Sequence, residues 1–115
     1  MTDLINFISI IIGGLLVFIG GLYDLIAAIG VNKFPDFYTR LHAVTIGAIG
    51  GAVYPIIGAA VMILGDSSLP LSIRLSYVLP MILIAVLIII TAPTGSHAVA
   101  RAAFRSGLKP LAEEE

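Results

Sequence analysis

The chain has 115 residues, of which 59% are hydrophobic and 11% are charged, with a net charge of -1 and no cysteine. Soluble domains carry about 25% charged residues, so this composition excludes an ordinary soluble protein and indicates an integral membrane protein. The lack of cysteine excludes a disulfide framework and cysteine-based metal sites. No basic patch supports nucleic-acid binding, so we expect no nucleic-acid partner.

Three apolar segments are long enough to cross a bilayer, which takes about 20 helical residues. We predict spans at about residues 4–29, 35–64 and 70–91, followed by a short interfacial helix at about 96–106. The expected fold is an all-α integral membrane protein with a single membrane domain over residues 1–115. The first span lacks the basic start and the cleavage site of a signal peptide, so we expect it to stay in the mature protein.

Small residues recur along the first two spans in a pattern typical of helix packing. In lipid, small side chains let helix backbones approach one another, because acyl chains provide no hydrophobic drive for association. The glycines predicted to pack are Gly20, Gly21, Gly47, Gly51 and Gly58. Pro55 lacks an N–H to donate to Gly51 and is expected to bend the second helix.

Asp24 is the carboxylate inside the first span, about two turns before its end. A charge at that depth costs several kcal/mol in hydrocarbon, which makes such a residue a functional candidate by default. Two interpretations stay open. Asp24 exchanges a proton or a cation, or it is a packing carboxylate that bonds to a neighbouring subunit or to Tyr54, Thr45 or Thr91.

The segment from Lys33 to Ala43 concentrates charge, aromatic side chains and a helix start. Pro35 suits the first helical turn, and Asp36 favours the positive end of the helix dipole and an i, i+4 pair with Arg40. We interpret the segment mainly as an anchor at the membrane surface. The predicted anchor residues are Phe34, Pro35, Asp36, Phe37 and Arg40, with Arg101 and Arg105 in the C-terminal helix.

A chemical interpretation of the same segment also stays open. His42 could pass protons, because imidazole is a common proton-transfer group in proteins, and Arg40 could hold a carboxylate of a partner. The candidates for an ion or proton pathway are Asp24, Tyr38, His42 and Thr45.

Basic residues predict the orientation in the membrane. With three spans, the first loop and the C-terminal tail share one side, which holds five basic residues against one on the other side. The five are Lys33, Arg40, Arg101, Arg105 and Lys109, and the one is Arg74. By the positive-inside rule, we expect the first loop and the C-terminus in the cytoplasm and the N-terminus outside the cell membrane.

Catalytic and cofactor motifs are missing from the sequence. There is no nucleophile with a nearby base, no glycine-rich phosphate loop after a strand, and no recognised ligand spacing for the two histidines. We therefore predict neither an enzyme nor a metal or cofactor site. Three helices also leave little room for a water-lined route with two gates, which favours a subunit over a complete transporter.

The stretch F-P-D-x-Y-x-R-L-H-A at residues 34–43, Thr91-Ala92-Pro93 and the segment at 97–107 resemble the G subunit of Mrp-type multisubunit sodium/proton antiporters. The resemblance covers nearly the whole chain. It implies a small three-span subunit of a large membrane complex, whose larger subunits carry the proton pathways. The same module occurs in archaeal membrane-bound hydrogenases and related respiratory complexes, where it is thought to couple electron transfer to sodium export.

The resemblance also implies the partners, which are other subunits of a hetero-oligomeric complex, the lipid bilayer, and sodium ions or protons. Two positions depart from the pattern. Many G subunits have a lysine where this chain has Ile46, and many have a neutral residue where this chain has Asp24. These departures leave open whether this copy belongs to an antiporter or to a hydrogenase-type assembly.

Residues and resemblance together predict an accessory ion-translocation subunit, with Asp24 as the strongest candidate for ion or proton contact. One alternative is a purely structural assembly subunit of the same kind of complex. Another is a self-assembling ring of carboxylate-bearing chains, like the rotor of a rotary ATPase, which also uses glycine-rich helices.

Overall fold

A computed structural model describes residues 1–110 and contains helices as its regular structure in that range. In chain order the elements are α1 (Thr2–Lys33), α2 (Phe37–Ala48), the π-helical segment η1 (Ile49–Val53), α3 (Tyr54–Gly65) and α4 (Leu71–Arg105). Because α2, η1 and α3 follow one another without a break, they form one rod over 37–65, and three helices are long and apolar enough to cross a membrane. The predicted all-α, three-span membrane protein is confirmed.

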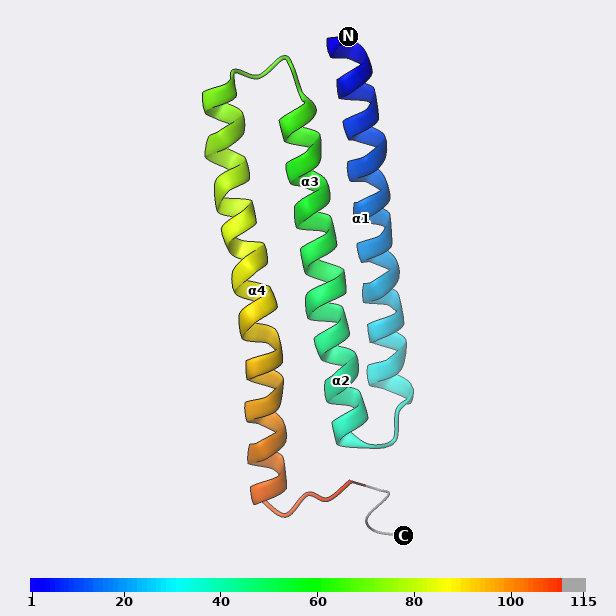
Figure 1. The fold of residues 1–115 in the computed structure, drawn as a ribbon. Coiled ribbons are helices and arrows are strands. Elements are labelled where there is room, and N and C mark those ends of the chain that lie inside the picture. Colours follow the sequence, from blue (N-terminus) through cyan, green and yellow to red (C-terminus); the bar gives the residue numbers. More distant parts are fainter. Residues whose placement is uncertain (111–115) are drawn as a thin grey trace.

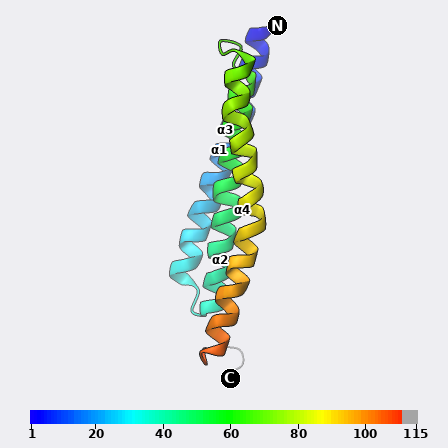
Figure 2. The same ribbon diagram turned by 90° about the vertical axis from the view of Figure 1, so that its left-hand side faces the viewer.

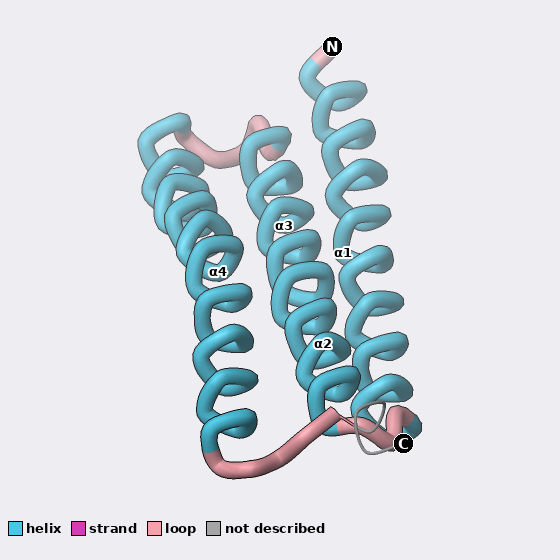
Figure 3. The backbone as a smooth tube through the Cα atoms, turned by 60° about the horizontal axis from the view of Figure 1, so that its bottom comes forward, coloured by secondary structure: helices cyan, strands magenta, loops and turns pink. Residues whose placement is uncertain are grey.

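The three long helices lie side by side in a thin layer (Figure 1 and Figure 2). The α2–η1–α3 rod is in the middle, and α1 and α4 pack on either side of it without contacting each other. The layer measures 63 × 23 × 13 Å. The N-terminus and the α3–α4 connection lie at one end, and the α1–α2 connection and the end of α4 lie at the other (Figure 3). Such a layer exposes two broad faces to lipid or to other proteins.

Glycines bring α1 and the middle rod into backbone contact. The buried positions of α1 are Ser9, Gly13, Gly20, Ala27 and Gly30, which follow a spacing close to 3.5 residues and so form one seam. At its centre, a Cβ added to Gly13 would lie 2.5 Å from the carbonyl oxygen of Gly58, and the reverse substitution would produce the same clash. These two positions therefore require glycine.

The separate interfacial helix predicted at about 96–106 is not formed in the described chain. Instead of stopping near residue 91 and restarting as a separate helix over 96–106, α4 continues through Pro93 to Arg105. Proline is tolerated inside membrane helices where other groups satisfy the freed backbone. The carbonyl oxygen that Pro93 leaves without its helical donor is that of Ile89. The hydroxyls of Thr91 and Thr94, on either side of Pro93, donate to the neighbouring carbonyl oxygens of Leu87 and Ile90, at 2.6 and 2.9 Å.

The start of the second span also differs from the prediction. Phe34 and Asp36 have extended backbones, so α2 begins at Phe37 and Pro35 lies before the helix rather than in its first turn. Asp36 is the N-cap residue, but its side chain makes no cap hydrogen bond. Arg40 donates from Nε to the carbonyl oxygen of Phe34 at 2.5 Å, which replaces the predicted Asp36–Arg40 pair.

Side chains fasten the opposite hairpin between α3 and α4. The backbone N–H and the hydroxyl of Ser68 donate to the Asp66 carboxylate at 2.9 and 2.6 Å, and these bonds, the side-chain one first, lower the pKa of Asp66 from its ordinary value. α4 begins directly after this turn, with Pro70 as its N-cap residue. Arg74 donates to the Leu64 carbonyl oxygen at 2.8 Å and so binds the C-terminal end of α3.

Candidate functional site

Asp24 lies on α1, nine residues before the last residue of the helix, Lys33. At 1.5 Å per residue this is about 13 Å along the axis, well inside a span of about 30 Å. Its carboxylate packs directly on the backbone of the middle rod: a Cβ added to Gly51 would overlap the carboxyl group, and one added to Gly47 would lie 4.0 Å from Oδ1. The acid thus occupies a place that glycine leaves free.

The rod widens where Asp24 meets it. Ile49–Val53 is π-helical, and Pro55 follows within two residues. Because proline has no N–H and its ring collides with the carbonyl of the fourth residue before it, a wide turn relieves the strain that Pro55 would impose on an α-helix. The ring of Pro55 in turn packs against Gly20 of α1, where a Cβ would overlap it. A π turn thus precedes Pro55, the residue at which we predicted a bend in the second helix.

No side chain or backbone group within residues 1–110 forms a hydrogen bond or ion pair with the Asp24 carboxylate, which is exposed on the surface of the layer. The three partners predicted for it inside the chain are not used. Thr45 bonds to the hydroxyl of Ser96 on α4 and to the Leu41 carbonyl oxygen, and Thr91 bonds to its own helix. Asp24 therefore has no partner within residues 1–110. Of the partners that we predicted for it, a neighbouring subunit is the one that remains.

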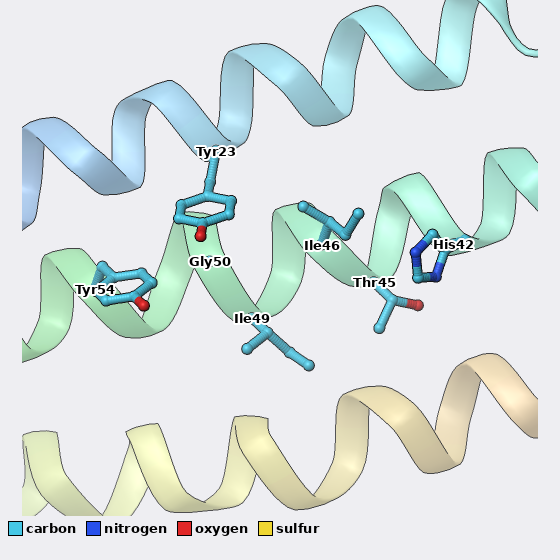
Figure 4. Close-up of a pocket in the computed structure, with 7 residues that line it drawn as sticks. All are labelled: Tyr23, His42, Thr45, Ile46, Ile49, Gly50 and Tyr54. Atoms are coloured by element: carbon cyan, nitrogen blue, oxygen red, sulfur yellow. The ribbon is translucent and has the colours of Figure 1, made fainter.

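A cavity of about 290 Å³ lies on the other side of the α1 seam from Asp24. It is lined by Tyr23, His42, Thr45, Ile46, Ile49, Gly50 and Tyr54 (Figure 4). The rings of Tyr23 and Tyr54 stack at a centroid distance of 5.5 Å and an interplanar angle of 6°. Tyr23 fits against Gly50, where a Cβ would overlap its ring, just as Asp24 fits against Gly51. Neighbouring residues of α1 therefore face different sides of the rod.

The structure brings two of the four predicted pathway residues together. His42 and Thr45 line the same cavity, whereas Asp24 is not among its lining residues. Tyr38 is also outside it, and its hydroxyl donates to the carbonyl oxygen of Leu108 at 2.6 Å, which ties the chain beyond α4 to the start of α2. A single route through all four residues is not formed by this chain alone.

Two cavity residues, Tyr23 and Tyr54, went unnoticed as a pair in the sequence. Each is an aromatic residue at mid-span, Tyr23 beside Asp24 and Tyr54 beside Pro55, and the glycine at position 50 signals the space that one ring needs. Gly21 differs from the other predicted packing glycines, because a Cβ there would meet nothing within 4 Å. Among residues 1–110, no three His, Asp or Glu side chains are grouped so that they could hold a metal ion.

Comparison with known proteins places the chain in a family. A family model described as a Na+/H+ antiporter subunit, covering PhaG, MnhG and YufB, matches residues 16–104. The chain belongs to this family of antiporter subunits. The match includes α1 from Leu16 onward, the whole middle rod and α4 almost to its end, so Asp24 and the cavity both lie inside it.

Relatives within the family come from bacteria and archaea. The chain is 37% identical over 103 residues to the antiporter subunit mnhG2 of Staphylococcus haemolyticus, with 90% of the chain and 56% of that protein covered. It is 35% identical to a UPF0091 protein of Pyrococcus horikoshii, with 93% and 88% covered. The chain thus spans a little over half the length of the staphylococcal relative and most of the archaeal one.

Two solved structures share the fold. One is a chain of the Mrp complex from Dietzia sp., with a TM-score of 0.75, 28% identity, and 91% of this chain and 86% of that chain covered. The other belongs to the membrane-bound sulfane sulfur reductase, an archaeal respiratory membrane complex, with a TM-score of 0.74, 31% identity, and 86% and 84% covered. An Mrp complex and an archaeal respiratory complex therefore each contain a chain with this fold.

One end of the layer carries exposed basic side chains. Arg101 and Arg105 are both exposed near the end of α4, one helical turn apart, and Lys33 ends α1 at the same end of the molecule. α4 has 35 residues and so extends about 52 Å, longer than the hydrocarbon requires. Its last turns therefore project beyond the other helices, as Figure 1 shows.

Proposed function

We propose that the chain is an accessory subunit of the ion-translocating part of a multisubunit sodium/proton antiporter or of a respiratory complex that contains the same module. The carrying observation is the unpaired Asp24 carboxylate on the surface of a span. A membrane protein that functioned alone would leave this charge facing lipid, at a cost of about 3 kcal/mol. A neighbouring subunit removes that cost by enclosing the acid.

Asp24 is the residue to which we assign ion or proton contact. Its carboxylate lies beside a π turn, and such turns within α-helices are frequent at functional sites. An oxygen ligand of this kind suits a hydrated monovalent cation or a proton, and no fixed cation of this chain competes for it within the described residues. The path itself requires the surfaces of partner subunits, because a single layer of three helices encloses no channel.

The cavity on the other side of the seam is a secondary candidate for proton contact. His42 and Thr45 line it together with the two stacked tyrosines, so four side chains with exchangeable protons lie along one groove of about 290 Å³. We propose the orientation with the α1–α2 connection and the C-terminus in the cytoplasm, on the charge bias alone.

Substitution of Asp24 tests the proposal against a purely structural role. In the intact complex, Asp24→Asn keeps the size of the side chain and removes its charge. We expect it to abolish most sodium-dependent proton exchange in membrane vesicles, measured per amount of assembled complex. Asp3→Asn, in the first turn of the same helix, is the matched control and should exchange ions at the wild-type rate.

The outcomes separate the two roles. Wild-type exchange by an assembled Asp24→Asn complex contradicts ion contact and supports a purely structural subunit. Loss of exchange together with loss of assembly assigns Asp24 to packing. A ring of identical copies on purification supports the rotor-type alternative instead.

A further inference from the structure

We propose that one flank of α1, formed by Val17, Gly21, Asp24 and Ala28, binds a transmembrane helix of a partner subunit that offers a hydrogen-bond donor to the Asp24 carboxylate. We call these four residues the acidic flank. The inference rests on the proposed function, because it requires that the chain be part of a larger complex.

The acidic flank is a single surface. Its residues are separated by four, three and four positions, which places them on one side of an α-helix. All four are exposed in the described chain, including 41% of Val17. A Cβ at Gly21 would meet nothing within 4 Å, so no part of the described chain covers that position. The acidic flank borders the buried seam of α1 and is left open by it.

Side-chain size distinguishes the acidic flank from the rest of the exposed surface of α1. Phe18, Leu22 and Leu25 are exposed by 65%, 43% and 58%, and these large apolar groups suit contact with acyl chains. Gly21 and Ala28, one turn on either side of Asp24, leave room for a second helix backbone to come close. A close helix contact is therefore favoured at the acidic flank and not at the neighbouring surface.

The carboxylate selects the chemistry of the occupant. Acyl chains offer no hydrogen-bond donor, so lipid at the acidic flank would leave Asp24 unsatisfied. A second copy of this chain related by a two-fold axis at the acidic flank would place two Asp24 carboxylates together, which is unfavourable for like charges. A helix of a different subunit that carries a lysine, arginine, amide or hydroxyl side chain at this depth satisfies the acid.

Photo-crosslinking in the intact complex tests the proposal. The photoreactive residue benzoylphenylalanine replaces Val17 or Ala28 on the acidic flank, and Phe18 or Leu25 as controls within one helical turn of them. We expect a covalent adduct with another subunit from Val17 and Ala28 and not from the controls. The crosslinked peptide should contain a hydrogen-bond-donating side chain within about one helical turn of the attachment point.

A variant with a larger side chain at Gly21 tests the proposal independently of the crosslinks. Gly21→Leu fills the open space beside Asp24 and should reduce copurification of the partner subunit by at least half, whereas Gly95→Leu, at another position with nothing within 4 Å, should not. The crosslinking variants keep the native Gly21. A folding defect in Gly21→Leu therefore does not affect the crosslinking result.

Several results would overturn the inference. These are adducts from Phe18 or Leu25 alone, adducts between two copies of this chain, an adduct with a wholly aliphatic peptide, or no adduct at all in a complex that still copurifies. In each case the subunit role stands and the acidic flank is refuted. If no other subunit copurifies, the proposed function fails as well.

Discussion

The middle rod packs differently against its two neighbours. On the α1 side, glycines bring the backbones together, with Gly13 against Gly58 and Gly20 against Pro55. On the α4 side, the residues of α4 that are buried are Val78 and Ala85, and two cavities of about 160 and 300 Å³ lie between that helix and the rod. We infer that α1 and the rod form a fixed unit, and that α4 is held more loosely.

This difference bears on function because the two interfaces carry different chemistry. The tight interface sets the positions of Tyr23 and Asp24, one on each side of the rod, and a small shift of α1 would move both. The looser interface depends on polar ties, chiefly the bond between the hydroxyls of Thr45 and Ser96. Substitutions in the two interfaces should therefore differ in cost.

The largest effect is expected from Gly58→Ala at the tight interface. The added Cβ would lie 2.5 Å from the Gly13 carbonyl oxygen, and a backbone atom cannot rotate away as a side chain can. Overpacking of this kind costs about 1–3 kcal/mol, so we expect lower thermal stability of the purified protein. Gly95→Ala is the control, since its Cβ meets nothing. Equal stability of the two variants would show that the interface is not tight.

A smaller effect is expected from Tyr54→Leu, which removes the stack with Tyr23. Aromatic pairs contribute about 0.5–1.5 kcal/mol beyond their buried area, and the loss should appear as a lower free energy of unfolding in a denaturing detergent. Tyr77→Leu, on an exposed tyrosine of α4, serves as the control. An effect at Tyr77 as large as that at Tyr54 would show that the stack with Tyr23 does not stabilise the tight interface.

The smallest effect is expected at the α4 interface. Thr45→Val and Ser96→Ala each remove one partner of the hydroxyl bond, and a double-mutant cycle isolates their coupling. Such bonds between membrane helices average about 0.6 kcal/mol, so we expect a coupling near that value. A coupling above about 2 kcal/mol would exceed the range measured for these bonds and would show that α4 is held as firmly as α1.

Hydrophobic length was sufficient to predict three helices that are long and apolar enough to cross a membrane. Gly20, Gly47, Gly51 and Gly58 lie where α1 meets the middle rod, whereas Gly21 does not. Local signals at prolines were less reliable. Pro93 looks like a helix end in the sequence, yet α4 passes through it, whereas Pro35 looks like a first turn and lies outside α2. In both cases the outcome depends on the surrounding chain, which a single proline does not reveal.

The candidate site was also predictable only in part, because the sequence does not reveal how α1 is rotated against the middle rod. Asp24 is conspicuous because charge is rare in a span, but its lack of a partner depends on which side of the rod it faces. One helical position separates Tyr23, which lines the cavity, from Asp24, which lies on the acidic flank. That separation follows from the packing of α1 on Gly50 and Gly51, which fixes the rotation of the helix.

The most direct test of the central claim is the identity of the proteins that copurify with this chain in mild detergent. If the unpaired Asp24 requires a neighbour, the chain should purify in a stable hetero-complex with large antiporter-like subunits, with or without electron-transfer subunits. Recovery of the chain by itself, or of a ring that contains only copies of it, would contradict the claim.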